Sequence, residues 1–310
     1  MDLSIGISMF SRSVDLLKRV LGLAILIYLC IFLSQNFSLI KNLNPLSLSK
    51  FALVFFGFYF FLSIPFWFTL LKKVPLLDLY SLSFLANFLN LFLPFRGGII
   101  VRASVLKKKF SISFKRYTSV SVLLSVSSIF SLGLFSLICS ESAIIRLSAY
   151  YYSIKTSSFI FFLSGLIFFL FSHVIVKRFK RDYLLDVFKI ENIVVTVICY
   201  FACIFLYFLR YKILFNIFNI IIDDFSLFTI TVFHLSIGLL TILPGNLGVK
   251  EFSFVGICSL FGIPSDISLA MVSLDRVLQV LYLSFASSLY MNRIGLKFSK
   301  LLNFRKDGLF

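Results

Sequence analysis

The chain has 310 residues, of which 60% are hydrophobic and only 14% are charged, and its mean hydropathy is +1.02. A soluble domain carries roughly 25% charged residues. The apolar side chains of this chain are therefore too numerous to be buried in the core of one soluble domain. The 30 Lys and Arg residues exceed the 13 Asp and Glu residues, which gives a net charge of +17. These basic residues lie mostly in short connections between apolar runs, which is typical of membrane proteins and argues against nucleic-acid binding.

Apolar runs that are long enough to cross a bilayer occur at 20–38, 51–71, 117–140, 156–176, 192–209, 225–243 and 267–290. Shorter apolar runs, marginal or too short for a full crossing, occur at 79–95, 213–222 and 252–263. The sequence therefore predicts an all-α integral membrane protein with about seven or eight crossings. We expect one polytopic helical bundle, a single transmembrane domain over residues 1–310.

The distribution of positive charge predicts the orientation of this bundle. Basic residues cluster before residue 20, in 96–116, in 177–191 and after 290. The positive-inside rule places both termini and the two basic loops in the cytoplasm, and the protein in the cytoplasmic membrane. Lys72 and Lys73 also fit this side, so the run 79–95 is expected to be re-entrant. Two cytoplasmic termini need an even number of crossings, so either 213–222 or 252–263 should complete an eighth.

Two stretches, near residues 94 and 244, resemble each other. Each ends an apolar run with Pro and Gly, places charge just beyond, and leads into another apolar run. The breaking residues are Pro94, Gly97 and Gly98 in the first stretch and Pro244, Gly245 and Gly248 in the second. Paired interrupted segments in two halves of a membrane chain are typical of a transporter's substrate site. The pattern predicts two broken or re-entrant segments and an internal repeat.

Arginines lie beside the first break. A broken helix exposes N–H groups at the positive end of the next half-helix, where an anion binds. Arg96 and Arg102 would hold a phosphate there with paired hydrogen bonds. The alternative is that both arginines only mark the cytoplasmic side and reach its lipid headgroups.

Charged residues also lie close to or within the last apolar runs. Lys250 and Glu251 follow the second break, and Asp275 and Arg276 lie inside the run 267–290. An ionisable group at membrane depth is destabilising unless it is paired with an opposite charge or hydrated, so it is a functional candidate. The alternative for Asp275 and Arg276 is a structural ion pair that joins two helices. We predict that the four residues and the two arginines of the first break bind a headgroup, without metal, cofactor or catalytic residue.

These motifs resemble those of the lysylphosphatidylglycerol synthase transmembrane family, a flippase-like membrane domain. The first family motif is matched by Pro94, Arg96, Gly97, Gly98 and Arg102, the second by Pro244, Gly245, Gly248, Lys250 and Glu251, and a late arginine by Arg276. Asn246 and Lys250 depart from the second motif, and the helix after the first motif lacks the family's usual Glu-Arg and Asp. Because the chain ends shortly after its last apolar run, we expect a stand-alone member without the soluble aminoacyltransferase domain.

The resemblance implies a function in cell-envelope biogenesis. Such a protein would move or present an anionic amphiphile, either an aminoacylated phospholipid or a polyprenyl- or lipid-linked saccharide. Its expected partners are membrane lipids and an envelope glycan or lipid-modifying enzyme, with no nucleic acid, and we expect no enzymatic activity of its own. The alternative is a membrane subunit of, or scaffold for, a glycosyltransferase or other lipid-modifying enzyme.

Overall fold

The computed structural model describes residues 43–70, 73–92, 97–143, 151–178, 186–239 and 248–294, with isolated positions at 27, 31, 34 and 35. Every extended regular element in this part of the chain is an α-helix, as the sequence predicts. The helices are α2 (Pro45–Thr69), α3 (Leu76–Phe92), α4 (Gly97–Phe110), α5 (Phe114–Ala143), α6 (Tyr151–Arg178), α8 (Ile190–Ile217), α9 (Asp224–Ile237), α10 (Val249–Leu260) and α11 (Ser265–Ile294). The predicted sites Pro94, Arg96, Pro244 and Gly245 and nearly all of the predicted span 20–38 lie outside the described residues.

Four helices in the described part of the chain, α2, α5, α8 and α11, are long and apolar enough to cross a membrane. At a rise of about 1.5 Å per residue each exceeds the roughly 30 Å hydrocarbon core. They coincide with the predicted runs 51–71, 117–140, 192–209 and 267–290. The protein is therefore a multi-pass membrane protein, and its number of crossings stays a prediction.

The run 156–176 lies within α6 and the run 79–95 overlaps α3, but three other apolar runs differ from what was expected. The run 213–222 is not a separate segment, because α8 continues without interruption to Ile217. The polar residues that separated it from 192–209 include Arg210, whose side chain is buried inside the bundle. The run 225–243 contains α9 of only 14 residues, and 252–263 contains most of α10, which has 12. Neither short helix spans a bilayer alone, since each is at most about 21 Å long.

Local sequence explains where helices begin and how close they come. Asn44 caps α2 by accepting a hydrogen bond from the Ser47 N–H at 2.8 Å, and Pro45 occupies the first turn. Helices α5 and α6 touch through their glycines. A Cβ on Gly133 would lie 2.4 Å from the backbone nitrogen of Phe162, so only glycine permits this approach.

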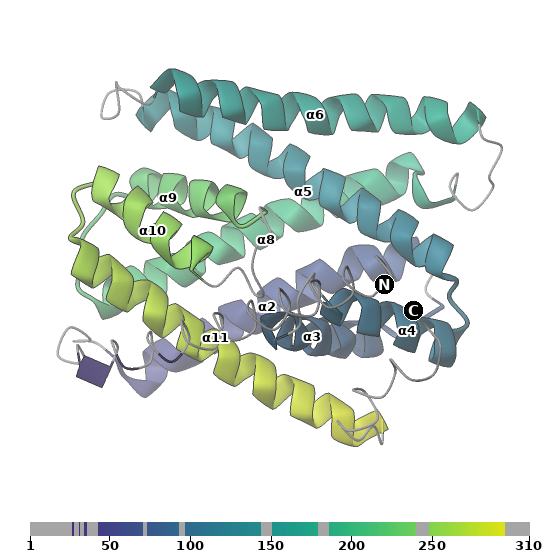
Figure 1. The fold of residues 1–310 in the computed structure, drawn as a ribbon, viewed down its shortest axis with the longest axis horizontal. Helices are drawn as coiled ribbons and strands as arrows, with labels where there is room; N and C mark the ends of the chain where they lie inside the picture. The colour runs from purple at the N-terminus through teal and green to yellow at the C-terminus, as the bar shows by residue number, and fades with distance from the viewer. Residues whose placement is uncertain are drawn as a thin grey trace, which may run out of the picture.

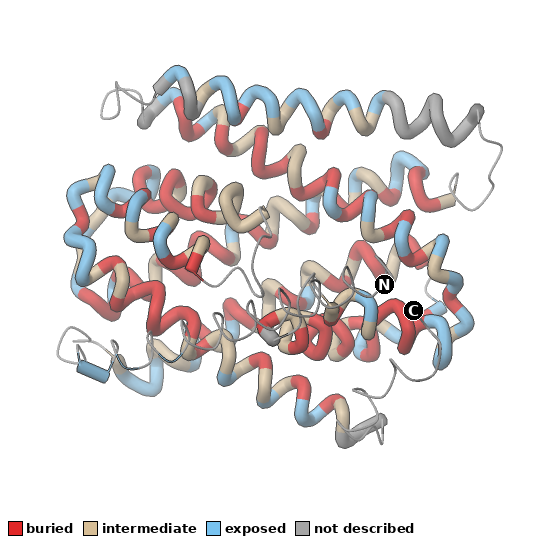
Figure 2. Tube along the Cα trace, viewed as in Figure 1, coloured by how far each residue is buried: buried red, intermediate tan, exposed pale blue. Residues whose placement is uncertain are grey.

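The helices form two sets with the same order. A long helix, a pair of short helices and a second long helix follow one another as α2 to α5 and again as α8 to α11. The short helices pack in pairs, α3 on α4 and α9 on α10, while α2 packs along α8 (Figure 1). Across the sets, α3 contacts α11 and α9 contacts α5. Helix α6 packs on α5 and exposes much of its outer face (Figure 2).

Side chains of α2, α8, α10 and α11 form a large apolar core. The side chains of Phe51, Phe55, Tyr211, Phe215 and Phe254 are almost fully buried there. Aromatic packing of this density fixes the relative positions of the helices, because interiors are close-packed. Four charged residues of the second half are buried in the same region: Arg210, Glu251, Asp275 and Arg276.

Candidate functional site

Helix α10 begins at Gly248, directly after the second helix break. Gly248 has a φ of 84°, a backbone conformation that glycine adopts without a steric penalty. Its N–H donates to Oε2 of Glu251 at 2.6 Å, so the carboxylate of the first turn caps the helix. The predicted break residue and the predicted carboxylate are therefore parts of one local structure.

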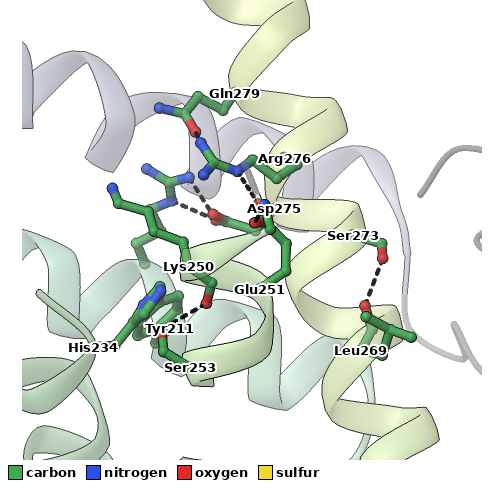
Figure 3. Close-up of polar contacts among 12 residues, drawn as sticks. Tyr211, His234, Lys250, Glu251, Ser253, Leu269, Ser273, Asp275, Arg276 and Gln279 are labelled. Atoms are coloured by element: carbon green, nitrogen blue, oxygen red, sulfur yellow. Dashed lines mark hydrogen bonds and ion pairs between the residues drawn. The ribbon is translucent and has the colours of Figure 1, made fainter. Parts of the chain in front are cut away.

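Glu251 also links α10 to α11. Its Oε1 accepts a hydrogen bond from Nε of Arg276, and the two side chains are 2% and 3% exposed. Nη1 of Arg276 donates to Oε1 of Gln279 at 2.9 Å, which orients the guanidinium further (Figure 3). Both oxygens of this buried carboxylate are therefore engaged.

Asp275 pairs with a different helix from its neighbour Arg276. Its Oδ1 lies 2.6 Å from both Nε and Nη2 of Arg210, which belongs to α8. The Arg210 guanidinium also lies 5.0 Å from the ring centroids of Phe51 and Tyr207, within cation–π range. Asp275 and Arg276 thus join α11 to α8 and to α10, rather than pairing with each other.

Lys250 contributes a third cation to the same region. Its aliphatic part packs over the end of α9, where a Cβ on Gly238 would lie 2.9 Å from the Lys250 Cε. No carboxylate among the described residues pairs with its ammonium, since Glu251 and Asp275 are held by the two arginines. The Lys250 side chain extends away from Glu251 in Figure 3. This lysine is only partly buried.

His234 lies below Lys250 in Figure 3 and comes from α9. Its Nδ1 shares a hydrogen bond with the hydroxyl of Tyr211, and its ring lies 5.3 Å from that of Phe254. The side chain is 3% exposed, and its Nε2 has no hydrogen-bond partner among the described residues. A buried imidazole nitrogen without a partner is costly unless a ligand or water satisfies it.

Together these residues form a charge cluster, a name used below for Arg210, Lys250, Glu251, Asp275, Arg276 and the adjoining His234. The cluster holds three basic side chains, those of Arg210, Lys250 and Arg276, and two carboxylates. It therefore carries an excess of one positive charge with His234 neutral. Because its charges are removed from bulk water, this excess attracts an anion more strongly than a surface lysine would.

The first break has a different geometry. Arg102 of α4 is 9% exposed, donates from Nε to the Tyr117 hydroxyl at 2.9 Å, and stacks 4.0 Å from the Phe66 ring centroid. Its Nη1 lies 3.5 Å from Oγ of Ser83, at the limit of a hydrogen bond. No carboxylate among the described residues pairs with this arginine. Arg102 is therefore a second buried cation that lacks a counter-ion in the described structure.

Glycine at the first break serves close packing. The Gly98 N–H donates to Oδ1 of Asn90 at 2.9 Å. A Cβ on Gly98 would lie 1.9 Å from the carbonyl oxygen of Ala86, which leaves no room for any other residue. Gly97 begins the same helix. The break thus brings α4 against α3 at the closest distance that their backbones allow.

The structure brings Lys250, Glu251, Asp275 and Arg276 together and places Arg102 elsewhere. The contacts of Arg102 come from α2, α3 and α5, and α4 lies on the opposite side of Figure 1 from α10. The expectation that one site would combine Arg102 with Lys250 or Arg276 is therefore not met in this structure. The predicted residues form two separate groups, one at each break.

Two members of the charge cluster were not singled out from the sequence as site residues. Arg210 directly follows the apolar run 192–209, and its acidic partner lies 65 positions further on. His234 lies within the run 225–243, where a lone histidine resembles an ordinary core residue. Arg210 could have been identified from the sequence as an isolated arginine between two apolar runs, because an arginine at membrane depth needs a partner.

No metal site accompanies these groups. Among the described residues, no three His, Cys, Asp or Glu side chains gather as a set that could hold a metal ion. The described cysteines are buried thiols: Cys139, Cys199, Cys203 and Cys258.

Comparison with known proteins relates the two breaks to a family. The profile of the family described as "Lysylphosphatidylglycerol synthase TM region" matches residues 19–287. This range contains both helix breaks and the whole charge cluster. No curated protein and no solved structure matches the chain. Because the match covers most of its length, the chain belongs to the lysylphosphatidylglycerol synthase transmembrane family.

Proposed function

We propose that this protein binds the anionic headgroup of a membrane lipid and moves it across the cytoplasmic membrane, as a flippase in cell-envelope biogenesis. The observation that carries the proposal is the charge cluster, in which Lys250 is left without a carboxylate partner at a helix break. A cation in that position is destabilising unless a ligand neutralises it. Membership in a transmembrane family named for a lipid-modifying synthase supports a lipid as that ligand.

The lengths of the helices and the positions of the charges support a specific topology. We propose that α3–α4 re-enters from the cytoplasm, where Lys73 and Lys107 to Lys109 flank it. The pair α9–α10 would then re-enter from the outer face, since no Lys or Arg lies within 218–223 or 261–264. The long helices α2, α5, α6, α8 and α11 with the predicted span 20–38 give an even number of crossings, as two cytoplasmic termini require.

In this topology the two sets of helices form an inverted repeat. The set α2 to α5 begins on the outer face, and the set α8 to α11 begins in the cytoplasm. The reciprocal contacts of α3 with α11 and of α9 with α5, about the central pair α2–α8, support this relationship. Inverted repeats with broken helices provide alternating access in many transporters.

The repeat gives the headgroup one cationic group near each face, Arg102 in the inner pair and Lys250 in the outer pair. Buried hydroxyls adjoin Arg102. Oγ of Ser83 is 3.1 Å from Oγ of Ser63, which donates to the backbone carbonyl of Tyr59 at 2.8 Å. We propose that the headgroup passes from one cation to the other while the acyl chains remain in lipid.

A second function, a scaffold for a lipid-modifying enzyme, is favoured by one observation. Residues 117–140 of α5, which follow the first break, contain no charged residue, although relatives usually carry charges in this helix. A chain without these groups could hold a lipid for a partner without moving it.

A vesicle assay separates the two functions. The purified protein is reconstituted into vesicles that contain a trace of headgroup-labelled phosphatidylglycerol, and a membrane-impermeant quencher is added outside. Transport predicts that the quenched fraction rises above that of empty vesicles because inner-leaflet lipid becomes accessible. If folded protein gives the same fraction as empty vesicles, while binding of the lipid is retained, the flippase function is wrong and the scaffold remains.

A further inference from the structure

We propose that the charge cluster binds a group with a single negative charge, held directly by Lys250 and His234, and so selects a phosphodiester headgroup over a phosphomonoester or a diphosphate. This inference rests on the proposed function and specifies the ligand of the same site. It also assigns binding roles to His234 and Arg210, which neither sequence motif contains.

The charge of the ligand follows from the partners already made. Arg276 is held by Glu251, and Arg210 is held by Asp275, with all four side chains at most 5% exposed. Breaking either buried pair leaves an uncompensated charge, so neither arginine is free to leave its carboxylate for a ligand. Among the described residues of the cluster, only Lys250 carries a charge that no ion pair neutralises. One negative charge on the ligand neutralises the cluster, and a second would be buried without a counter-ion.

The sequence that joins α9 to α10 adds no acidic residue next to Lys250 in the chain. The segment that connects α9 to α10 includes residues 240–247, which are Leu-Thr-Ile-Leu-Pro-Gly-Asn-Leu. None of these side chains is charged. This segment therefore contains no carboxylate that could neutralise Lys250.

His234 supplies the second contact. Its Nδ1 is occupied by the Tyr211 hydroxyl, and its buried Nε2 has no hydrogen-bond partner among the described residues. The His234 ring lies beside Lys250 in Figure 3. An imidazole N–H at this position can donate to a phosphate oxygen without adding charge. The pair Lys250 and His234 thus offers one charge-assisted and one neutral donor, which matches the two unesterified oxygens of a phosphodiester.

Arg210 is a positioning residue in this site. It holds Asp275 away from Lys250 through two contacts of 2.6 Å, Nε and Nη2 to Oδ1. Without Arg210, the Asp275 carboxylate would lose its partner, and its negative charge would offset the excess positive charge that attracts the ligand.

The test measures binding, not transport. Full-length protein in detergent is titrated with dioleoyl lipids that differ only in headgroup: phosphatidylglycerol, phosphatidic acid, diacylglycerol diphosphate and phosphatidylcholine. At pH 8 the phosphomonoester of phosphatidic acid carries about two negative charges. We expect phosphatidylglycerol to bind at least about tenfold more tightly than phosphatidic acid and the diphosphate, because a hydrogen bond to a charged group is worth roughly 1.5–3 kcal/mol. Phosphatidylcholine should also bind more weakly, because its own quaternary ammonium group already neutralises its phosphodiester.

Variants assign the selectivity to the proposed ligands. Lys250→Met should lower the affinity for phosphatidylglycerol at least about tenfold and leave it close to that for phosphatidylcholine, whereas Lys250→Arg should keep the preference. His234→Gln should weaken binding less. The matched control is Lys212→Met, since Lys212 forms an exposed pair with Asp224 at 2.7 Å. It should bind like the wild type.

Two results would overturn the inference. One is tighter binding of phosphatidic acid or of the diphosphate by the wild type. The other is a Lys250→Met protein that elutes as a folded monodisperse species and still selects phosphatidylglycerol. Neither result bears on whether lipid crosses the membrane. Conversely, selective binding by a protein that transports nothing would leave the inference standing and remove the flippase function.

Discussion

Arg210 of α8 and Asp275 of α11 lie 65 positions apart in the sequence, yet their side chains meet at 2.6 Å inside the bundle. Because Asp275 is taken by Arg210, Arg276 is left to pair with Glu251. The two ion pairs use every carboxylate of the charge cluster. This arrangement makes Lys250 the unmatched cation on which the proposed function depends.

The first prediction concerns the buried ion pair. Asp275→Asn should lower the free energy of unfolding by about 3–5 kcal/mol, since it leaves the Arg210 charge buried without a counter-ion. The double variant Arg210→Met with Asp275→Leu should recover most of this loss. Thermal unfolding in one detergent measures both. Additive losses in the double variant would show that the two residues are not energetically coupled.

The second prediction concerns the start of α10. Gly248→Ala should destabilise the protein by about 1–2 kcal/mol, because a φ of 84° is strained for a residue with a Cβ. Lipid transport should fall with it, since Gly248 orients Glu251. Gly256→Ala is the control within the same helix, where a Cβ would meet no atom within 4 Å. Equal stability of the two variants would contradict a structural role for the positive φ.

The third prediction concerns the first break. Gly98→Ala should separate α3 from α4, since the added Cβ would lie 1.9 Å from the Ala86 carbonyl oxygen. We expect a loss of stability of about 2 kcal/mol or more and a loss of transport. Gly57→Ala places a Cβ at an ordinary 3.6 Å from Leu206 and should be tolerated. Comparable unfolding temperatures for the two variants would exclude tight packing at Gly98.

The fourth prediction concerns Arg102. Arg102→Ala should remove most lipid transport, whereas Arg102→Lys should keep part of it. Lysine keeps the charge but not the planar guanidinium, which stacks on Phe66 and donates to Tyr117. The exposed Lys108→Ala is the control. Initial rates in vesicles with equal amounts of protein are compared. Equal, small losses for Arg102→Ala and Lys108→Ala would mean that positive charge at this break only orients the protein.

The fifth prediction concerns the two re-entrant pairs. A cysteine at Ser113, between α4 and α5, should react only from the cytoplasm, and one at Ser265, after α10, only from the outer face. The native cysteines of the described part are buried, so they should react slowly with an impermeant maleimide. Intact cells and opened membranes are compared. Labelling of Ser265→Cys exclusively from the cytoplasm would refute the opposite orientations of the two pairs.

The sequence was sufficient for the fold class and for much of the candidate site. Hydropathy predicts helices such as α2 and α11, because a long apolar segment in lipid must satisfy its backbone hydrogen bonds internally. The role of Gly248 could also be anticipated, since positive φ and proximity to Glu251 are local properties. Gly98 was predicted for the same reason, although its close contact with Ala86 appears only once α3 and α4 are packed.

The partners of the charged residues were not predictable in this way. Asp275 and Arg276 are adjacent, so the sequence suggested one ion pair between helices, but it could not say which helices. The answer depends on Arg210. This residue follows the apolar run 192–209 in the sequence but lies inside α8 in the structure. Similarly, nothing local to Arg102 indicates that its contacts come from α2, α3 and α5.

The sequence by itself determined that the chain lies in a membrane, that its helices break near residues 94 and 244, and which charges accompany each break. Those properties follow from backbone and solvation energies that act within a few residues. Only the tertiary structure decided that Arg102 stands apart from the charge cluster and that no carboxylate of the described residues pairs with Lys250. Ion pairs form between side chains that packing brings together, and the packing of α8, α10 and α11 is set by contacts across the whole chain.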